Sequence, residues 1–435
     1  MQNKCMKKNI QNRRFFMRYN VSCDAGNSSI KTLINGDKPM LFENVVADPS
    51  GTNYMQNPDL AGAGIQKLDV TINRNFNKSY GKENHFLFGN ITEKHNAYRE
   101  SRTDKLKAND DQLADSILTA IAYSILYHEK KNGENIQNKK TLNVDLTTGL
   151  PFHEWVIKEQ KERFKKNLQG NHTIKFNHPW FGENSYPEEI EMTVNISNIL
   201  VEGETTASLI LSDTDNEFQK YSPKKILGKI VVLIDIGAYT TEVIGKQFIR
   251  LIEEDEDFLS KYESKETIVT HETLPTLSMG IERGIGHIYE STIKSIKQKY
   301  PKVDKLIIQD LENALGSDGT IDGKPGNLIG LDINILEDFK VHARNYADYI
   351  AKQIENIYNK NKNKNKITRI YLSGGGSQID VIVKQIKEAL KKDDIDPSKI
   401  AIVTDPNPVF ANCFGYYIEN KQMQEDLETE GEMVI

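Results

Sequence analysis

The stretch that most constrains the fold is residues 230–246, IVVLIDIGAYTTEVIGK. It begins as an apolar, β-branched run typical of a buried strand, and it places Asp235 where burying an uncompensated carboxylate is costly. Small or hydroxyl-bearing residues follow before the strand pattern resumes, and these favour a sharp turn: Gly237, Ala238, Tyr239, Thr240 and Thr241. Such a turn presents backbone N–H groups and hydroxyls. The stretch therefore predicts a hairpin that closes on an anion.

The same arrangement occurs near the N-terminus, in residues 19–33, YNVSCDAGNSSIKTL. Asp24 ends a strand pattern, the turn contains polar and flexible residues, and Lys31 lies on the returning strand; the turn residues are Gly26, Asn27 and Ser28. A single Asp-x-Gly turn is more often an ordinary hairpin. Two of them, about two hundred residues apart, indicate two related lobes whose hairpins face each other.

Two facing hairpins of this kind predict a site for a chain of phosphates. Turn amides and hydroxyls neutralise phosphate oxygens, and two inward aspartates hold a hydrated Mg²⁺ ion. We therefore expect Asp24 and Asp235 to bind the metal through its waters, and Lys31 to offset charge on the phosphates.

A third signal lies in residues 367–380, ITRIYLSGGGSQID, where three glycines join a strand to an amphipathic helix. A backbone without Cβ atoms lets a flat ring or a phosphate approach closely; the residues are Gly374, Gly375 and Gly376. The alternative is a strand-to-helix loop that uses glycine for positive φ angles, which is the more frequent case for an isolated motif.

Together, these motifs resemble those of the actin-like ATPase superfamily, and most closely those of the ParM-like bacterial plasmid-segregating actins. By this resemblance, residues 24–27 (DAGN) form the first phosphate motif, residues 235–241 the second, and residues 374–376 the adenosine motif. The connecting segments 144–151 (VDLTTGLP) and 410–416 (FANCFGY) are also similar to those of the superfamily.

The resemblance implies an α/β fold of the actin, sugar kinase and heat-shock chaperone type, with two related lobes around a nucleotide. It divides the chain into a basic N-terminal extension (1–16), lobe I (17–215, with a variable part at about 40–107), lobe II (216–404), a closing helix that returns to lobe I (405–420) and an acidic tail (421–435). Gly280 and Glu282 would lie on the adenine side, although a single charge at a helix start is often only a cap.

The candidate catalytic acids lie in residues 199–211, ILVEGETTASLIL. Residues 204–207 (ETTA) resemble the Glu-Pro-x-Ala pattern of the chaperone and MreB branches, but they lack its proline. Glu204 is the first candidate to orient or deprotonate the attacking water, and Glu202 is the alternative. A surface ion pair remains an open interpretation for one of the two.

Composition excludes several functional classes. With 435 residues, 38% hydrophobic and 27% charged, the chain has the balance of a soluble protein of two or three domains. It has no run of about 18 apolar residues and no apolar segment after its basic N-terminus, so we expect neither a membrane span nor a signal peptide. Three scattered cysteines favour a reducing cytoplasm. A net charge of −6 argues against direct nucleic-acid binding over the whole surface.

What the resemblance implies for function is an ATPase whose filaments grow with Mg·ATP and fall apart after hydrolysis. Its partners would be copies of itself and a DNA-binding adaptor protein on a centromere-like plasmid site, with no membrane partner. The basic arm, residues 1–16, is either a solvated extension or a contact to DNA, adaptor or neighbouring subunit. The alternatives are a small-molecule kinase of the same fold and a chaperone-like or regulatory ATPase that does not polymerise. A chaperone would need a further domain after the closing helix, and GTP in place of ATP stays open.

Overall fold

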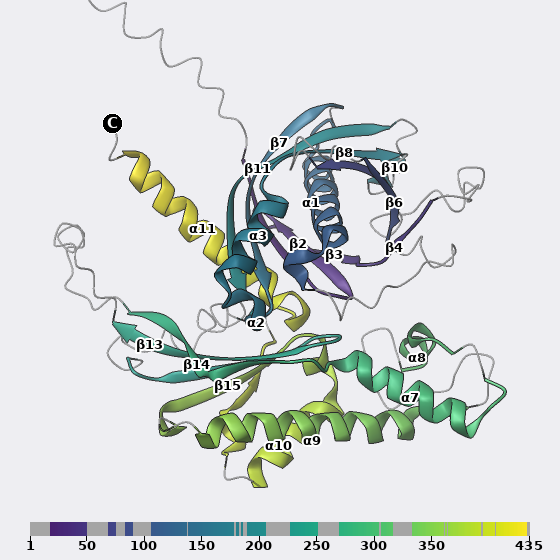
Figure 1. Ribbon diagram of the computed structural model, residues 1–435, viewed down its shortest axis with the longest axis vertical. Helices are drawn as coiled ribbons and strands as arrows, with labels where there is room; N and C mark the ends of the chain where they lie inside the picture. The colour runs from purple at the N-terminus through teal and green to yellow at the C-terminus, as the bar shows by residue number, and fades with distance from the viewer. Residues whose placement is uncertain are drawn as a thin grey trace, which may run out of the picture.

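The computed structural model of the protein describes residues 18–49, 68–74, 83–89, 106–136, 138–177, 180–181, 184–185, 189–205, 227–250, 269–303, 306–315, 333–360, 362, 364–392, 395–404 and 406–432. These residues form two lobes, each built on one main sheet, with lobe I above lobe II in the view of Figure 1. The basic extension expected at residues 1–16 lies outside the described residues.

Lobe I contains a nine-stranded sheet in the order β3-β2-β1-β7-β11-β8-β5-β6-β4. Its strands are β1 (Arg18–Ala25), β2 (Ser29–Ile34), β3 (Met40–Glu43), β4 (Val46–Ala47), β5 (Leu68–Arg74), β6 (Asn84–Phe88), β7 (Lys140–Leu150), β8 (Gly170–Asn177) and β11 (Ile190–Gly203). The short strands β9 (Trp180–Phe181) and β10 (Asn184–Ser185) pair separately. The variable part of the sequence thus contributes strands to the lobe I sheet.

The helix α1 (Asp111–Lys131) packs against this sheet. It starts where Asp110 accepts a hydrogen bond of 3.0 Å from the N–H of Leu113, which is the preferred chemistry of an N-cap. Before it lies η4 (Lys107–Asn109), one turn of 3₁₀ helix. Lys107 of this turn donates a hydrogen bond of 2.7 Å to the carbonyl of Ala25, the last residue of β1.

Lobe II contains a five-stranded sheet in the order β14-β13-β12-β15-β16. Its strands are β12 (Ile230–Ile236), β13 (Thr241–Arg250), β14 (Val269–Ile281), β15 (Ile367–Ser373) and β16 (Ile400–Ile402). Its helices are α7 (Ile285–Lys299), α8 (Ile308–Leu315), α9 (Leu336–Lys360) and α10 (Asp380–Lys392), with short 3₁₀ turns η5 (Lys364–Lys366), η6 (Gly375–Gln378), η7 (Pro397–Lys399) and η8 (Pro408–Phe410). The helices α9 and α10 lie on the side of this sheet away from lobe I (Figure 1).

The two lobes repeat one arrangement of five strands. In lobe I, β3, β2 and β1 are antiparallel neighbours, and β1 is followed by parallel β7 and β11. In lobe II, β14, β13 and β12 are antiparallel, and β12 is followed by parallel β15 and β16. The hairpins β1–β2 and β12–β13 are therefore equivalent elements, as the repeated sequence pattern predicted.

The helix α11 (Ala411–Glu432) runs from the side of lobe II onto lobe I. In lobe I, the amide of Asn420 donates to the carbonyls of Val21 and Asp145, at 3.2 and 2.9 Å. The helix continues to Glu432 instead of ending at residue 420, so the expected acidic tail is largely helical. The reason is local: residues 421–432 are rich in Glu and Gln, which favour helix.

The segment after the Gly-Leu-Pro turn forms two helices, α2 (Phe152–Trp155) and α3 (Lys158–Leu168). The break falls at Val156 and Ile157, and Ile157 has an extended backbone with φ −95° and ψ 110°. Two consecutive β-branched residues disfavour helix because their χ1 angles are restricted against the preceding turn.

No helix in the described part of the chain is long and apolar enough to cross a membrane.

Candidate nucleotide site

The first hairpin brings Asp24 and Lys31 together as directly opposite residues of β1 and β2. The Lys31 Nζ lies 2.8 Å from Asp24 Oδ2, and both side chains are largely buried. Burial works to lower the pKa of Lys31, but Asp24 and other nearby carboxylates outweigh it and raise that pKa. The ammonium therefore stays charged inside the site.

The turn of this hairpin is held from outside by one asparagine. The Asn44 amide donates to the carbonyl of Gly26 at 3.0 Å, and its backbone N–H donates to the carbonyl of Ser28 at 2.9 Å. Asn27 is half-buried and Ser28 is exposed, so the turn has surface available to a ligand. Asn44 therefore fixes the backbone of the turn at two points.

The second hairpin places Asp235 near the end of β12. Burial raises the pKa of Asp235 to about 7, and the carboxylate of Asp24 acts in the same direction. The Asn412 amide of α11 donates to Asp235 Oδ2 at 2.9 Å, and the turn closes through a 2.9 Å bond from Gly237 N–H to the Thr240 carbonyl. The helix that joins the lobes therefore helps to orient the second aspartate.

The first turn of α7 is joined to the second hairpin by backbone hydrogen bonds. The N–H groups of Ile285 and Gly286 donate to the carbonyls of Gly237 and Ala238, at 3.0 and 2.6 Å. Because these N–H groups have no partner within the helix, the turn supplies their acceptors. A Cβ at Gly284 would lie 2.4 Å from the Gly237 carbonyl oxygen, so only glycine permits this approach.

Two residues of the second turn are directed into lobe II. The Tyr239 ring packs on Gly286, where an added Cβ would lie 3.0 Å from it. The Thr241 hydroxyl donates to the Arg283 carbonyl at 2.8 Å and lies 2.5 Å from the Tyr346 hydroxyl. Thr241 therefore supports the hairpin from within lobe II.

The three glycines after β15 pack against the second hairpin. Gly374 has φ +76°, and a Cβ there would lie 2.1 Å from Asp235 Oδ1. A Cβ at Gly376 would lie 2.1 Å from Ile236, whereas Gly375 has room for one. At Gly374, a positive φ and the close approach of Asp235 therefore both require glycine, and the expected approach of a ring or phosphate stays a prediction.

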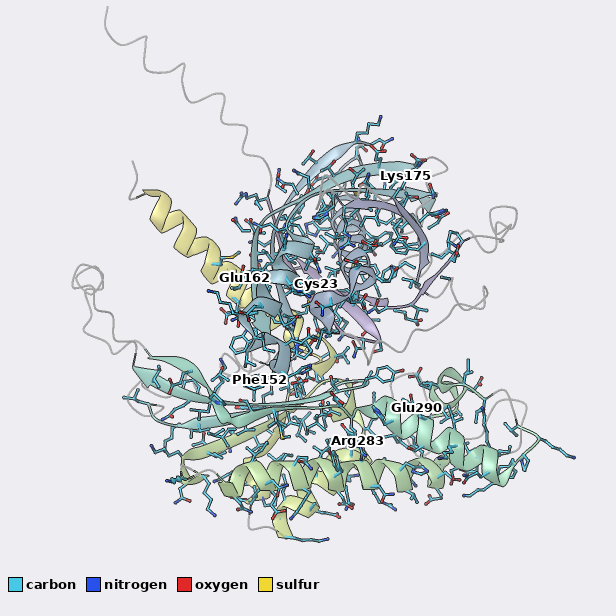
Figure 2. All side chains as sticks on the ribbon, viewed as in Figure 1. Cys23, Phe152, Glu162, Lys175, Arg283 and Glu290 are labelled. Atoms are coloured by element: carbon cyan, nitrogen blue, oxygen red, sulfur yellow. The ribbon has the colours of Figure 1, made fainter. Side chains whose placement is uncertain are left out.

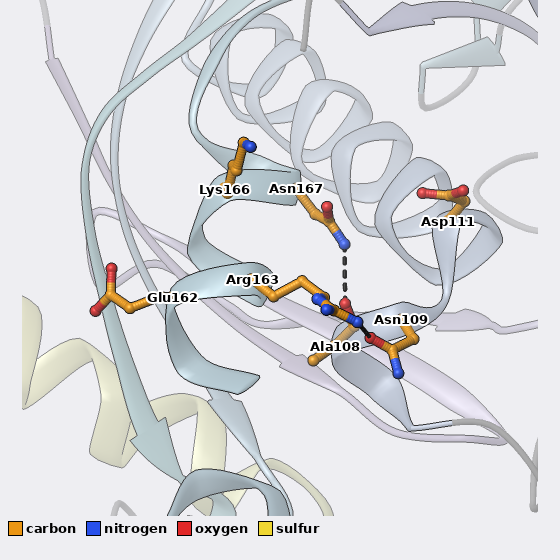
Figure 3. A pocket seen from close by; sticks show the side chains of 7 residues that line it. All are labelled: Ala108, Asn109, Asp111, Glu162, Arg163, Lys166 and Asn167. Atoms are coloured by element: carbon orange, nitrogen blue, oxygen red, sulfur yellow. Dashed lines mark hydrogen bonds between the residues drawn. The ribbon is translucent and has the colours of Figure 1, made fainter. Parts of the chain in front are cut away.

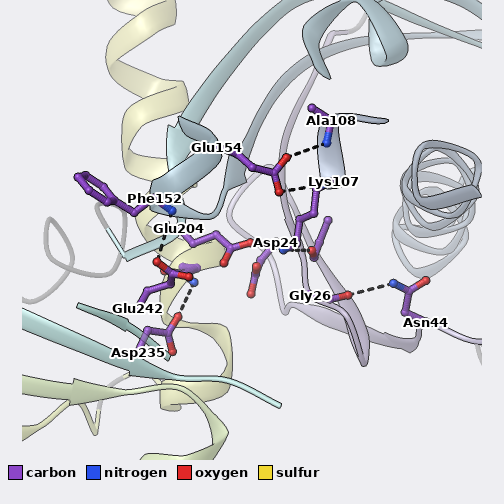
Figure 4. A network of polar contacts seen from close by, with 12 residues as sticks. Asp24, Gly26, Asn44, Lys107, Ala108, Phe152, Glu154, Glu204, Asp235 and Glu242 are labelled. Atoms are coloured by element: carbon purple, nitrogen blue, oxygen red, sulfur yellow. Dashed lines mark hydrogen bonds and ion pairs between the residues drawn. The ribbon is translucent and has the colours of Figure 1, made fainter. Parts of the chain in front are cut away.

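Side chains from both lobes converge at the junction shown in Figure 4. Besides the two aspartates and Lys31, which pairs with Asp24, the group contains Glu204 just after β11, Lys107 of η4 and Glu242 of β13. Lys107 donates to Glu204 and, at 2.7 Å, to the Ala25 carbonyl. Burial and the nearby Asp24 raise the pKa of Glu204, while Lys107 opposes the shift.

Sequence reasoning missed Lys107 and Glu242. Lys107 belongs to a polar, Lys-rich stretch without a motif, and it reaches Glu204 across 97 residues of sequence. Glu242 does carry a local signal, because it is opposite Asp235 in the β12–β13 hairpin. Burial raises the pKa of Glu242 well above its ordinary value, and Glu204 adds to the effect.

The two candidate catalytic acids have different surroundings. Glu204 lies in the buried group of charges, whereas the charges that act on Glu202 are Glu419, Lys246 and lysines of α3. Burial raises the pKa of Glu202 to about 7. Of the two candidates, Glu204 therefore is the one that lies among the charges of the first hairpin and Lys107. The residues that follow it in the ETTA pattern, 206–207, lie outside the described residues.

Gly280 and Glu282, both expected on the adenine side, lie in the last residues of β14 and just after it. Gly280 pairs with Glu242 in the sheet, and a Cβ there would lie 3.2 Å from both carboxylate oxygens. Glu282 is exposed just after β14. The guanidinium of Arg283 lies over the Tyr349 ring at 4.5 Å. Gly280 thus gives room to a buried acid at the lobe junction.

The side chains of the junction include the oxygen ligands that suit a hydrated divalent cation. Four acidic side chains, those of Asp24, Glu204, Asp235 and Glu242, share the junction with the ammonium groups of Lys31 and Lys107, which pair with Asp24 and Glu204. Within the described residues, no group of three or more His, Cys, Asp or Glu side chains is arranged to hold a metal directly. Mg²⁺ keeps several of its waters in proteins, so binding through water suits these residues.

A separate surface pocket of about 470 Å³ lies on lobe I, between η4, the first turn of α1 and α3 (Figure 3). It is lined by Ala108, Asn109, Asp111, Glu162, Arg163, Lys166 and Asn167. None of the predicted nucleotide-binding residues lines it. Its relevance to the site is that Arg163 and Asn167 of α3 bond η4 from this side, at 2.6 Å to Asn109 Oδ1 and 3.0 Å to the Ala108 carbonyl.

Residues 22–201 match the protein family described as the N-terminal domain of actin-like proteins. The fold is similar to that of the actin-like protein Alp7A, with a TM-score of 0.66 at 15% identity over 96% of this chain and 100% of that one. It is also similar to a ParM in a 15-stranded filament from Clostridium botulinum, with a TM-score of 0.61 at 20% identity over 93% of this chain and 99% of that one. A third similar structure is that of Bacillus thuringiensis ParM with ATP. Its TM-score is 0.54 at 15% identity, over 94% of this chain and 99% of that one.

No protein of curated function matches the sequence. The α/β architecture with two repeated lobes, the family match and the similar structures agree with one another. The chain is therefore an actin-like protein in fold, with ParM-type and Alp7A-type structural neighbours, and the resemblance predicted from its motifs is confirmed.

Proposed function

We propose that this protein is a cytoplasmic ATPase that polymerises with Mg·ATP, depolymerises after hydrolysis and moves plasmid DNA through a DNA-binding adaptor protein. The observation that carries the proposal is the convergence of Asp24 and Asp235, from equivalent hairpins, on one buried group of charges. Polymerisation is further supported by the similarity in fold to a ParM that forms a filament.

The residues of the junction divide the work of hydrolysis. The two turns bind the phosphates, and the ammonium of Lys31 offsets their charge. Glu204 orients the attacking water and accepts its proton, and Lys107 keeps the Glu204 carboxylate in place. Asp24 and Asp235 would hold Mg²⁺ through the water molecules on the metal, and the bound Mg²⁺ would neutralise charge on the phosphates.

The change of lobe position on hydrolysis would couple the nucleotide to assembly. The structural basis is that α11 contacts both hairpins: Asn412 bonds Asp235, and Cys413 donates to the Ser22 carbonyl at 3.5 Å. A difference in phosphate contacts at either hairpin therefore acts on the helix that joins the lobes. The filament would be built from copies of this chain, with the adaptor as its link to DNA.

The test is 90° light scattering of the full chain with Mg·ATP, followed in parallel with phosphate release. We expect scattering to rise before phosphate appears. Glu204→Gln should keep the rise and slow hydrolysis about 100-fold or more, because a positioned base contributes roughly 10²–10⁴-fold. Asp235→Ala should lose both signals. Glu202→Gln is the matched control and should behave like the natural chain.

Three outcomes would contradict parts of the proposal. Unchanged scattering with nucleotide bound rules out the filament and directs the search to phosphoryl acceptors of a kinase. Slow hydrolysis in Glu202→Gln but not in Glu204→Gln exchanges the roles of the two acids. Equal light scattering and phosphate release with ATP and with GTP would contradict a preference of the site for adenine.

A further inference from the structure

The 3₁₀ turn η4, which carries Lys107, is held by an acid that the proposed mechanism does not use. The two carboxylate oxygens of Glu154 accept the backbone N–H groups of Lys107 and Ala108, at 2.9 and 3.0 Å. The residue at the cap position, Leu106, has no side-chain acceptor. Glu154 therefore supplies the acceptors that the start of a helical turn lacks, and its negative charge suits that end of the turn.

Glu154 is itself part of α2, a helix with anchors on both lobes. On lobe I, the Trp155 indole N–H donates to the Val201 carbonyl of β11 at 3.2 Å, three residues before Glu204. On lobe II, Glu242 Oε2 accepts the Phe152 N–H at 3.4 Å. Phe152 lies on the side of lobe I that faces lobe II (Figure 2). The helix α2 thus touches η4, the strand that carries the candidate base, and the second hairpin.

Glu242, which α2 contacts on lobe II, is a buried acid, and only its Oε2 accepts a hydrogen bond among the described residues. Within the described part of the chain, no hydrogen-bond partner is found for Glu242 Oε1. A buried carboxylate with an unused acceptor costs free energy, so its place in the lobe junction calls for a compensating role. Gly280 beside it leaves the space that the carboxylate fills.

We propose that α2 is a positioning element of the ATPase site: Glu154 holds Lys107 against Glu204, and Glu242 ties α2 to the second hairpin. Hydrogen bonds join Glu242 to Phe152, the Lys107 N–H to Glu154 and the Lys107 side chain to Glu204, and Phe152 and Glu154 belong to the same helix α2 (Figure 4). Hydrolysis then depends on the position of lobe II relative to lobe I. This inference rests on the proposed ATPase function.

We call these connected contacts from Glu242 to Glu204 the relay. The relay predicts a different effect on hydrolysis from the one expected if Glu154 bound ATP directly. Glu154 bonds η4 rather than either hairpin, so its loss should lower kcat and leave the affinity for ATP unchanged. We expect Glu154→Gln to lower kcat on the order of 10-fold to 100-fold, because small displacements of catalytic groups have effects of this size. Glu159→Gln, an exposed glutamate on neighbouring α3, is the matched control.

The test is a double-mutant cycle on the full chain, with single-turnover hydrolysis and ATP affinity measured separately. If Glu154 acts through Lys107, Glu154→Gln should change kcat by less than about 2-fold in a Lys107→Met background. Likewise, Glu242→Met should change kcat by less than about 2-fold in a Glu154→Gln background. The cycle of Glu242→Met with Lys107→Met tests the relay without altering Glu154, should Glu154→Gln fail to fold.

The outcomes separate this inference from the proposed function. Absence of hydrolysis by the natural chain overturns the ATPase proposal and the relay with it. Hydrolysis by the natural chain with effects that multiply independently in both cycles overturns the relay alone. Weakened ATP affinity in Glu154→Gln, with kcat unchanged, also overturns it.

Discussion

Removing Lys107 should destabilise lobe I by an amount that depends on pH. Its side chain and that of Glu204 are only 9% and 10% exposed, so Lys107→Met leaves a buried carboxylate without its cation. Breaking such a pair costs about 3–5 kcal/mol. The variant can limit the loss by protonating Glu204, which costs about 3.7 kcal/mol at pH 7 from an ordinary pKa of about 4.3. We therefore expect a loss of about 3–4 kcal/mol at pH 7.

The sign of the pH dependence follows from where the proton is bound. In the Lys107→Met variant, folded Glu204 holds a proton that the unfolded chain releases above pH ~4.3. Its folded-state pKa is raised, so the stability of the variant falls as pH rises, by up to about 1.4 kcal/mol per unit. The deficit relative to the natural chain should be larger at pH 8 than at pH 6.

Urea unfolding without nucleotide or Mg²⁺, followed by tryptophan fluorescence, measures this effect. Both tryptophans, Trp155 and Trp180, precede β12 and so report on lobe I. The control is Lys131→Met, which breaks an exposed pair with Asp37, 49% and 34% exposed, and should cost about 0.2–1 kcal/mol. A loss in Lys107→Met no larger than in this control, or one independent of pH, would refute the reasoning.

Two further predictions concern the glycine loop and a buried histidine. Gly374→Ala should weaken ATP binding at least 10-fold by displacing Asp235, whereas Gly133→Ala, with the similar φ of +79° and open space, should leave it unchanged; isothermal titration calorimetry tests both. Burial lowers the pKa of His172 to about 4, so its neutral form stabilises the fold above pH ~6.5. That stabilisation, up to about 3 kcal/mol, should be lost as pH falls from ~6.5 to ~4. Urea unfolding across this range should show a shallower decline for His172→Leu, and an equal slope would contradict the assignment.

The elements that the sequence predicted correctly are those with a local signal. The hairpins around Asp24 and Asp235 are set by β-branched runs that end in an aspartate and a flexible turn, and nearby residues suffice to specify them. The glycine loop at 374–376 is likewise specified by nearby residues, because it lies directly between a strand and a helix in the sequence. Helix α11 also has a local cause for extending past residue 420, since residues 421–432 favour helix.

The sequence alone determined the repeated hairpins, the glycine loop and hence the actin-like fold, because each is encoded within a few consecutive residues. The tertiary structure decided which charges meet. Lys107 reaches Glu204 across 97 residues, Glu242 reaches Phe152 across 90, and Glu154 reaches Lys107 across 47. No periodicity or turn signal encodes such contacts, since they depend on how two sheets and a connecting helix pack. Burial at that junction is what makes these charges depend on one another.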